Sequence, residues 1–290
     1  MSSLYGFEVK SDFPCQRLNS AAGTRGELVI EAAVEPLVPP AGEPAGELVG
    51  ADGKRWYASY ELDDGDCLLQ MPPTGSFLLA PARGRITVEP TDGDVELLEH
   101  RLASSAICTL LSLRGDLALH AAAVESDGRA IVFCGPSLRG KSTLAQALGE
   151  AGCRVLGEDG IAIELGEAGP VAHPGARGVR MRGPGGGQQR PVLVEDPGAG
   201  EPGPSPVAAV VLLGERGPEF AIEPLVPARA LALLTPHLIH SGGRGSIAAA
   251  FQRLASLLGA VPALQISLPD DLGALPETCQ RFLDSTRIRG

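Results

Sequence analysis

Residues 135–143 read Gly-Pro-Ser-Leu-Arg-Gly-Lys-Ser-Thr, with two glycines followed by Lys and Ser at the spacing of a phosphate-binding loop. Glycine lets the backbone curl so that successive N–H groups point inward, and a helix that begins at the end of such a loop adds the positive end of its dipole. In this pattern Lys141 neutralises phosphate oxygens and the Ser142 hydroxyl binds Mg²⁺. The pattern therefore predicts a site for the phosphates of a nucleotide.

The flanking residues supply the context that this loop requires. Residues 130–134 form a short apolar run typical of a buried strand, and residues 142–150 have a helical pattern that ends near Gly152. The chain has only three lysines, and one of them stands where the motif needs it. The alternative is a glycine-rich loop that holds no phosphate. If the motif is functional, the phosphates are expected to contact Gly135, Ser137, Arg139, Gly140, Lys141, Ser142 and Thr143.

Charge and composition exclude several kinds of partner. The 290 residues carry a formal net charge of −11 at pH 7, so there is no basic field to attract a nucleic acid or an anionic membrane. No apolar run reaches the roughly 20 residues of a membrane-spanning helix, and the first residues lack a basic region followed by an apolar stretch. We expect a cytoplasmic protein. The six cysteines contain no C-x-x-C pair, so buried, reduced thiols are expected rather than a metal site.

The periodicity of the chain divides it into two parts. Residues 1–92 show short alternating segments broken by Gly, Pro and Asp, which predict a small, mostly β N-terminal domain. Apolar residues recur on a helical period over residues 94–113, and this helix is expected to join the first domain to a second one at 93–290. Residues 117–124 and the following Asp127-Gly128 turn predict a hairpin that leads into the strand before the loop.

The rest of the second domain reads as mixed α/β. Residues 183–206 are too rich in Gly and Pro to hold regular structure through most of their length, so we expect a loop there. That loop is either a lid over a substrate or an insertion without such a role. Beyond it, strands are predicted at 207–213 and 262–268 and helices at 228–234 and 246–258.

Acidic and imidazole side chains near the loop are candidates for its chemistry. Glu158 and Asp159 directly follow a short strand at 154–156, where carboxylates could face the loop and serve a metal or a base. Their alternative is a solvated turn. His120 lies in a mostly apolar segment, so it is either a core histidine or a site residue. The basic stretch His173–Arg182 could present guanidinium groups to phosphates, or it is a plain charged surface.

These elements resemble one protein family. His120, the 135–143 loop and the pair Glu158-Asp159 follow the order and spacing of the core of the HPr kinase/phosphorylase family and its shorter kinase-like relatives. That family shares its nucleotide-binding core with the phosphoenolpyruvate carboxykinases. The opening residues 5–14 and the tail at 268–271 also resemble the shorter relatives. The resemblance implies an α/β fold with a phosphate-loop core of the HPr kinase and phosphoenolpyruvate carboxykinase type beside the small β-rich domain.

The resemblance also implies a reaction, the transfer of the ATP γ-phosphate to a serine of a protein or peptide with Mg²⁺ as cofactor. By analogy with the family, Glu158 takes the position of the general base, and Asp159 helps Ser142 to hold Mg²⁺. Lys141 and His120 are expected to assist catalysis.

Three functions stay open at this point. The first is the serine kinase, and an intact Lys141 and Ser142 favour it. The second is a catalytically degenerate, kinase-like protein that binds a peptide, for example the precursor (leader) peptide of a ribosomal-peptide natural product pathway, at an exposed β edge. Leu138, Arg139 and Glu158 favour it, because they stand where the family has small residues and an aspartate. The third is a small-molecule kinase. The oligomeric state is open, since no heptad pattern is present.

Overall fold

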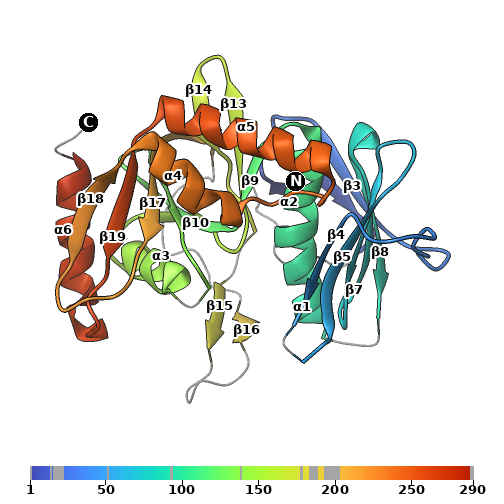
Figure 1. Cartoon of the computed structure of the whole chain (residues 1–290), viewed down its shortest axis with the longest axis horizontal. Helices are drawn as coiled ribbons and strands as arrows, with labels where there is room; N and C mark the ends of the chain where they lie inside the picture. Colours follow the sequence, from blue (N-terminus) through green and yellow to red (C-terminus); the bar gives the residue numbers. More distant parts are fainter. Residues whose placement is uncertain are drawn as a thin grey trace.

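The protein, described here from a computed structural model, is a mixed α/β chain built on two large sheets (Figure 1). The strands of the eight-stranded first sheet come from residues 3–90, and those of the nine-stranded second sheet come from residues 117–267. This arrangement confirms the expected mixed α/β class and the β-rich first part. The described residues are 2–13, 15, 23–50, 52–91, 94–137, 139–176, 179–182, 189–192 and 203–287.

The first sheet has the order β1-β2-β3-β8-β7-β6-β5-β4, so β1 and β4 form its two edges. Its pairs β2–β3 and β3–β8 are parallel and the others are antiparallel. Buried residues alternate with half-buried or exposed ones along β3 and β8, as expected of strands with one face on a core. The strands are β1 (Ser3–Leu4), β2 (Phe7–Ser11), β3 (Glu27–Ala32), β4 (Gly46–Val49), β5 (Arg55–Glu61), β6 (Cys67–Met71), β7 (Gly75–Ala80) and β8 (Arg85–Pro90).

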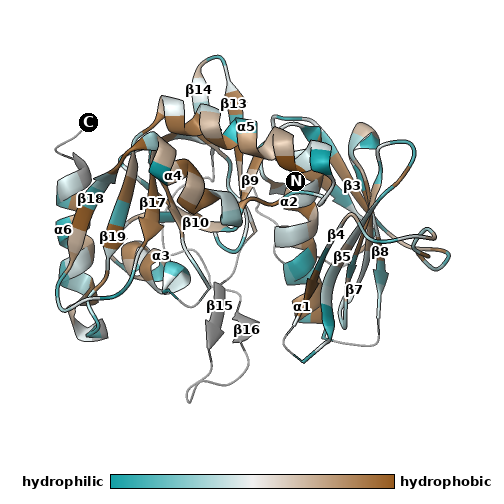
Figure 2. Cartoon of the chain, viewed as in Figure 1, coloured by the Kyte–Doolittle hydropathy of each residue, from teal (hydrophilic) through white to brown (hydrophobic). Residues whose placement is uncertain are grey.

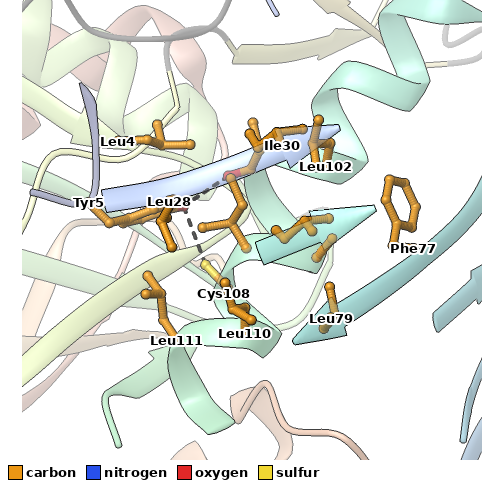
Figure 3. Packing of buried hydrophobic residues seen from close by; sticks show 14 of the residues in the cluster. Leu4, Tyr5, Leu28, Ile30, Phe77, Leu79, Leu102, Cys108, Leu110 and Leu111 are labelled. Carbon is orange, nitrogen blue, oxygen red and sulfur yellow. Dashed lines mark hydrogen bonds between the residues drawn. The ribbon is translucent and has the colours of Figure 1, made fainter. Parts of the chain in front are cut away.

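A long helix packs against this sheet. The Asp94 side chain accepts a hydrogen bond from the Leu97 N–H at the start of the helix, and Gly115 ends it in a left-handed conformation with φ +115°. The predicted helix at 94–113 is therefore confirmed, but it consists of α1 (Val95–Arg101), a π-helical segment (Leu102–Ala106) and α2 (Ile107–Arg114). Figure 3 shows Leu102, Leu110 and Leu111 packed against the sheet residues Leu28, Ile30, Phe77 and Leu79.

The second sheet lies between two layers of helices. Alternate residues of its strands face opposite layers: Ala121 and Ala123 of β10 pack on the side of α4 and α5, whereas Ala122 and Val124 pack on the side of α3 and α6. Figure 2 shows how apolar the central strands β10 and β17 are, as both-sided burial requires. The strands are β9 (Leu117–Leu119), β10 (Ala121–Ser126), β11 (Arg129–Cys134), β12 (Arg154–Gly157), β13 (Ile161–Gly166), β14 (Gly169–Ala172), β17 (Ser205–Leu213), β18 (Ala221–Leu225) and β19 (Ala263–Ser267).

The order of this sheet is β12-β10-β11-β17-β14-β13-β9, and β19 pairs with β17 and β18. β11, β17 and β19 run parallel, so their carboxyl ends meet at one edge. Helix α5 extends from this layer toward the first part of the chain (Figure 1), where Arg253 donates a hydrogen bond of 2.8 Å to the Ser112 carbonyl of α2. The helices are α3 (Lys141–Glu150), α4 (Pro227–Leu234), α5 (Arg244–Ala260) and α6 (Leu275–Arg287).

The structure refines two local predictions. The hairpin expected around the Asp127-Gly128 turn is confirmed as β10 and β11, but its first strand begins only at Ala121, because the chain changes partners at His120 and β9 pairs with β13 instead. The segment 183–206, expected to lack regular structure through most of its length, contains β16 (Gln189–Val192), which pairs with β15 (Val179–Arg182), and β17 begins at Ser205. Partner strands supply hydrogen bonds that composition does not reveal. Most of the remaining segment lies outside the described residues.

The two parts of the chain share one apolar cluster. The core around α1 and α2 includes Ala118 and Ala162 from the second sheet as well as the strands of the first. The domain boundary near residue 92 stays a prediction. Within the described ranges, every helix falls short of the length and apolar character needed to cross a bilayer.

Candidate phosphate-binding site

The glycine loop (residues 135–140) lies between β11 and α3, as the sequence predicts. The strand ends at Cys134, and α3 begins at Lys141 with Gly140 as its N-terminal cap residue. Gly140 has φ +101°, a conformation that strains any residue with a Cβ, and a Cβ there would also lie 3.3 Å from the Arg216 guanidinium. Among the described residues no side chain caps this helix end, so the first-turn amides and the helix dipole favour an anion there.

The Lys141 side chain folds back onto the start of the glycine loop. Its Nζ donates a hydrogen bond of 2.8 Å to the Gly135 carbonyl oxygen, and the residue is only 7% exposed. Burial lowers the pKa of the ammonium, while Asp159, Cys134 and Glu158 act to raise it. The structure thus holds a buried cation at the loop, close to two acidic side chains.

The other loop residues differ in their surroundings. Ser137 and Thr143 are exposed, and Ser142 is half-buried. Arg139 bonds Glu215, with 3.0 Å between Nη2 and Oε1, so its side chain is directed to a surface acid in this conformation. Leu138 lies outside the described residues. Of the predicted phosphate contacts, Lys141 and Ser142 are the ones whose side chains lower the pKa of Glu158.

Glu158 is the most unusual group of the site. It is 3% exposed, and within the part of the chain that the structure describes neither of its carboxyl oxygens has a hydrogen-bond partner. Burial raises its pKa to about 8, Asp159 adds to the rise, and Ser142 and Lys141 oppose it. Ser142 thus lies close to Glu158, although the two do not form a hydrogen bond of ordinary geometry. A carboxyl without a partner is costly to bury, so it marks a place where a cation or a donor fits.

Asp159 is held by a residue that the sequence did not single out. Nε2 of His100, in α1, lies 2.9 Å from Oδ2 of Asp159, a distance at which an imidazole N–H donates to a carboxylate. The Asp159 backbone is left-handed, with φ +59°. The sequence carried no signal for this pair, because the contact joins residues that are 59 positions apart.

Two more histidines, His120 and His237, lie next to each other near Lys141. The backbone N–H of His120 donates a hydrogen bond of 2.7 Å to the His237 carbonyl, next to the bridge between Leu119 and Leu238. His237 is almost fully buried, and burial lowers its pKa to about 4, with further lowering by the charges of Lys141 and His120. His237 thus lies close enough to both His120 and Lys141 to feel their charges. The role of His120 stays a prediction, and His237 was missed because nothing in its local sequence indicates the contact.

The turn at residues 158–160, the acidic turn, is also braced from the first sheet. The Tyr5 hydroxyl lies 2.8 Å from the Gly160 carbonyl oxygen. It also accepts a hydrogen bond from the Cys108 thiol (Figure 3). Burial raises the pKa of Tyr5 well above its usual range. The opening residues on which the family resemblance partly rests thus include one that contacts the site.

The residues of the basic stretch His173–Arg182 lie in two different places. His173 is buried and its Nε2 lies 2.8 Å from Glu164 Oε2, within an ion-pair network that includes Arg25 and Asp116. This network lies apart from the glycine loop in its contacts. Arg180 and Arg182 are on β15, which lies beside α3, and Arg177 is outside the described residues.

Mg²⁺ and a nucleotide fit the residues that are present. The orphaned carboxyl of Glu158, the Ser142 hydroxyl and Asp159 provide oxygen ligands or bases next to a helix end without a side-chain cap. No group of three or more His, Cys, Asp or Glu suited to a metal occurs among the described residues. Mg²⁺ does not require one, because it is typically bound through one or two carboxylates together with substrate phosphates. Of the six free cysteines, five are buried and Cys15 is half-buried.

The chain matches no protein-family model and no curated protein. Among solved structures it is similar to the HPr(Ser) kinase/phosphatase from Coxiella burnetii, with 13% sequence identity and a TM-score of 0.34. The match covers 59% of this chain and 97% of that chain. A similarity of this size is too slight to assign a family, so the resemblance stays a prediction and the function has to be argued from the site.

Proposed function

We propose that this chain binds ATP with Mg²⁺ at the glycine loop and transfers the γ-phosphate to a serine hydroxyl of a protein or peptide. The observation that carries the proposal is Glu158, a buried carboxyl with no hydrogen-bond partner in the described residues, beside the lysine and serine that follow the loop. Such a group destabilises the fold, and an enzyme that needs a base or a metal ligand there has a reason to keep it.

The loop residues would bind the phosphates. The amides at the start of α3 favour an anion, and Lys141 would leave the Gly135 carbonyl to contact the terminal phosphates. Ser142 and Asp159 would hold Mg²⁺, which neutralises charge on the transferred group when bound. Since phosphoryl transfer relies on positioning and charge neutralisation, these groups suffice for its electrostatic part.

Glu158 would accept the proton of the attacking hydroxyl. With a pKa of about 8 it is largely protonated at pH 7, so it needs a nearby positive charge to become the base. Any cation bound at Ser142 lowers that pKa and favours the carboxylate. His120 would assist from the side of Lys141, with His237 behind it.

A second candidate function is peptide binding on a degenerate kinase-like fold, and one observation favours it. β4 is an edge strand with exposed apolar residues: Leu48 is 61% and Val49 is 48% exposed, and Trp56 on the neighbouring β5 is 46% exposed. An extended segment, such as a precursor (leader) peptide, could pair with this edge. The same edge could also serve the kinase by docking its substrate.

The test begins with calorimetric titration of the full chain with Mg·ATP, followed by incubation with γ-labelled ATP and a library of serine peptides. Micromolar nucleotide binding and label on phosphoserine are the expected result. If the chain does not bind Mg·ATP even at millimolar concentration, the proposed kinase activity is overturned. In that case the peptide library should still bind, and Val49→Pro, which removes an N–H from β4, should abolish the binding.

A further inference from the structure

We infer that His100 is a positioning residue, which orients the Asp159 carboxylate toward the metal–nucleotide complex. The inference rests on the proposed function, because it concerns the metal side of the same site. It starts from the 2.9 Å contact between His100 Nε2 and Asp159 Oδ2. Both side chains are largely withdrawn from solvent, 5% and 19% exposed, so water competes little for this contact.

The backbone of Asp159 needs such support. Its φ of +59° is a conformation that non-glycine residues rarely adopt and that persists only where the surroundings hold it. The hydrogen bond from His100 holds the side chain, and Tyr5 contacts the carbonyl of the next residue, Gly160, at 2.8 Å. The acidic turn is therefore held from two elements of the first part of the chain.

The helix that carries His100 contains a π-helical segment at the place where the acidic turn packs against it. The π-helical segment begins at Leu102, directly after α1, and the turn packs tightly against it. A Cβ on Gly160 would lie 2.8 Å from Cys108 Sγ and 3.1 Å from the Ser104 carbonyl oxygen. π-Helical insertions often occur at functional sites. Here the insertion begins two residues after the histidine and lies where the acidic turn packs against the helix.

Groups that hydrogen-bond a metal-ligating side chain fix its orientation, and their loss typically lowers metal affinity about 10- to 100-fold. The glycine loop and Lys141 lie between β11 and α3, beside the second sheet, whereas His100 belongs to the helix that packs on the first. Removal of His100 should therefore weaken metal binding and leave the contacts between nucleotide and loop in place. A histidine that only tied α1 to the turn would have no such selective effect.

The experiment uses the full chain and a non-hydrolysable ATP analogue, and it measures two affinities. One is the Mn²⁺ affinity of the protein–nucleotide complex, from the spin-resonance signal of free Mn²⁺, and the other is the nucleotide affinity in EDTA. For His100→Ala we expect a loss of about 10- to 100-fold in Mn²⁺ affinity and less than a 3-fold change without metal. His100→Gln, which keeps a side-chain N–H donor, should recover most of the loss.

Two further variants separate positioning from general damage. His240→Ala removes a half-buried histidine whose Nδ1 accepts from the Gly242 N–H, away from the acidic turn, and it should leave the Mn²⁺ affinity unchanged. In an Asp159→Ala background, His100→Ala should cost no additional Mn²⁺ affinity. Wild-type Mn²⁺ affinity in His100→Ala would overturn the inference, as would equal losses with and without metal. A wild-type chain that binds no nucleotide would instead overturn the proposed function itself.

Discussion

The Nζ of Lys141 and the carbonyl oxygen of Gly135 are 2.8 Å apart, so the glycine loop is closed by the lysine that follows it. The cation is thereby buried before any phosphate is bound, with the loop carbonyl as its partner. A phosphate oxygen would replace a neutral acceptor with a charged one, which adds Coulomb attraction between the two ions to the hydrogen bond. The Gly135 carbonyl is thus the weaker of the two acceptors, and a phosphate oxygen can take its place on Lys141.

Lys141→Met should reduce the affinity for Mg·ATP about 100-fold, because it removes the charged donor and keeps the apolar stem that packs under the loop. Calorimetric titration measures this directly. Lys54→Met is the matched control, since the Lys54 side chain is 80% exposed and far from the loop in its contacts. Equal affinity of the Lys141 variant and the wild type would show that the loop does not bind phosphate.

Glu158→Gln should make the folded protein more stable at pH 7. Burial raises the pKa of Glu158 to about 8, so between pH 4.5 and 8 the folded state binds more protons than the unfolded state. The free energy of unfolding then falls as the pH rises through this window, by roughly 1–3 kcal/mol at pH 7. A neutral glutamine removes this cost.

Urea unfolding at pH 4.5 and pH 7 tests that difference. Glu158→Gln should gain at pH 7 and change little at pH 4.5, whereas Glu167→Gln, at an exposed position, should change neither value. A Glu158 variant less stable than the wild type at pH 7 would mean that the carboxylate has a stabilising partner.

His237→Gln should flatten the loss of stability in mild acid. Burial lowers the pKa of His237 to about 4, below the 6.5 of the unfolded chain. The stability from the neutral imidazole is present above pH 6.5 and is lost as the pH falls toward 4, by roughly 1–3 kcal/mol. Unfolding free energies at pH 7.5, 6 and 5 should therefore fall less steeply in the variant. Parallel profiles for the two proteins would exclude His237 as a contributor.

Tyr5→Phe should destabilise the protein by about 1–2 kcal/mol, because it leaves the buried Gly160 carbonyl without the Tyr5 hydroxyl at 2.8 Å. Tyr57→Phe is a suitable comparison: its hydroxyl reaches the His240 carbonyl only at 3.5 Å, and we expect a loss below about 0.5 kcal/mol. Thermal unfolding of the two variants measures both. Equal effects would argue against a specific brace at the acidic turn.

Local patterns predicted much of this architecture. The loop was predictable from its flanks, an apolar run before Gly135 and a helical pattern after the glycines. The long helix begins after Asp94 and ends at Gly115, as capping preferences require. What escaped prediction depends on contacts between distant residues. The contacts of His100 with Asp159 and of His237 with His120 produce no periodic pattern in the sequence. The π-helical insertion is not marked by any distinctive residue composition. The pairing of β16 with β15 depends on a partner strand that Gly and Pro content cannot reveal.

The parallel pairing of β11 with β17 has a consequence for how the chain is made. Residues 129–134 can form their hairpin with β10 as soon as they leave the ribosome, but their other edge pairs with residues 207–212. During synthesis the strand that leads into the glycine loop therefore exposes an apolar edge until the chain has grown past β17. Strand edges left open in this way are prone to aggregation, so fragments that end before residue 213 should depend on chaperones.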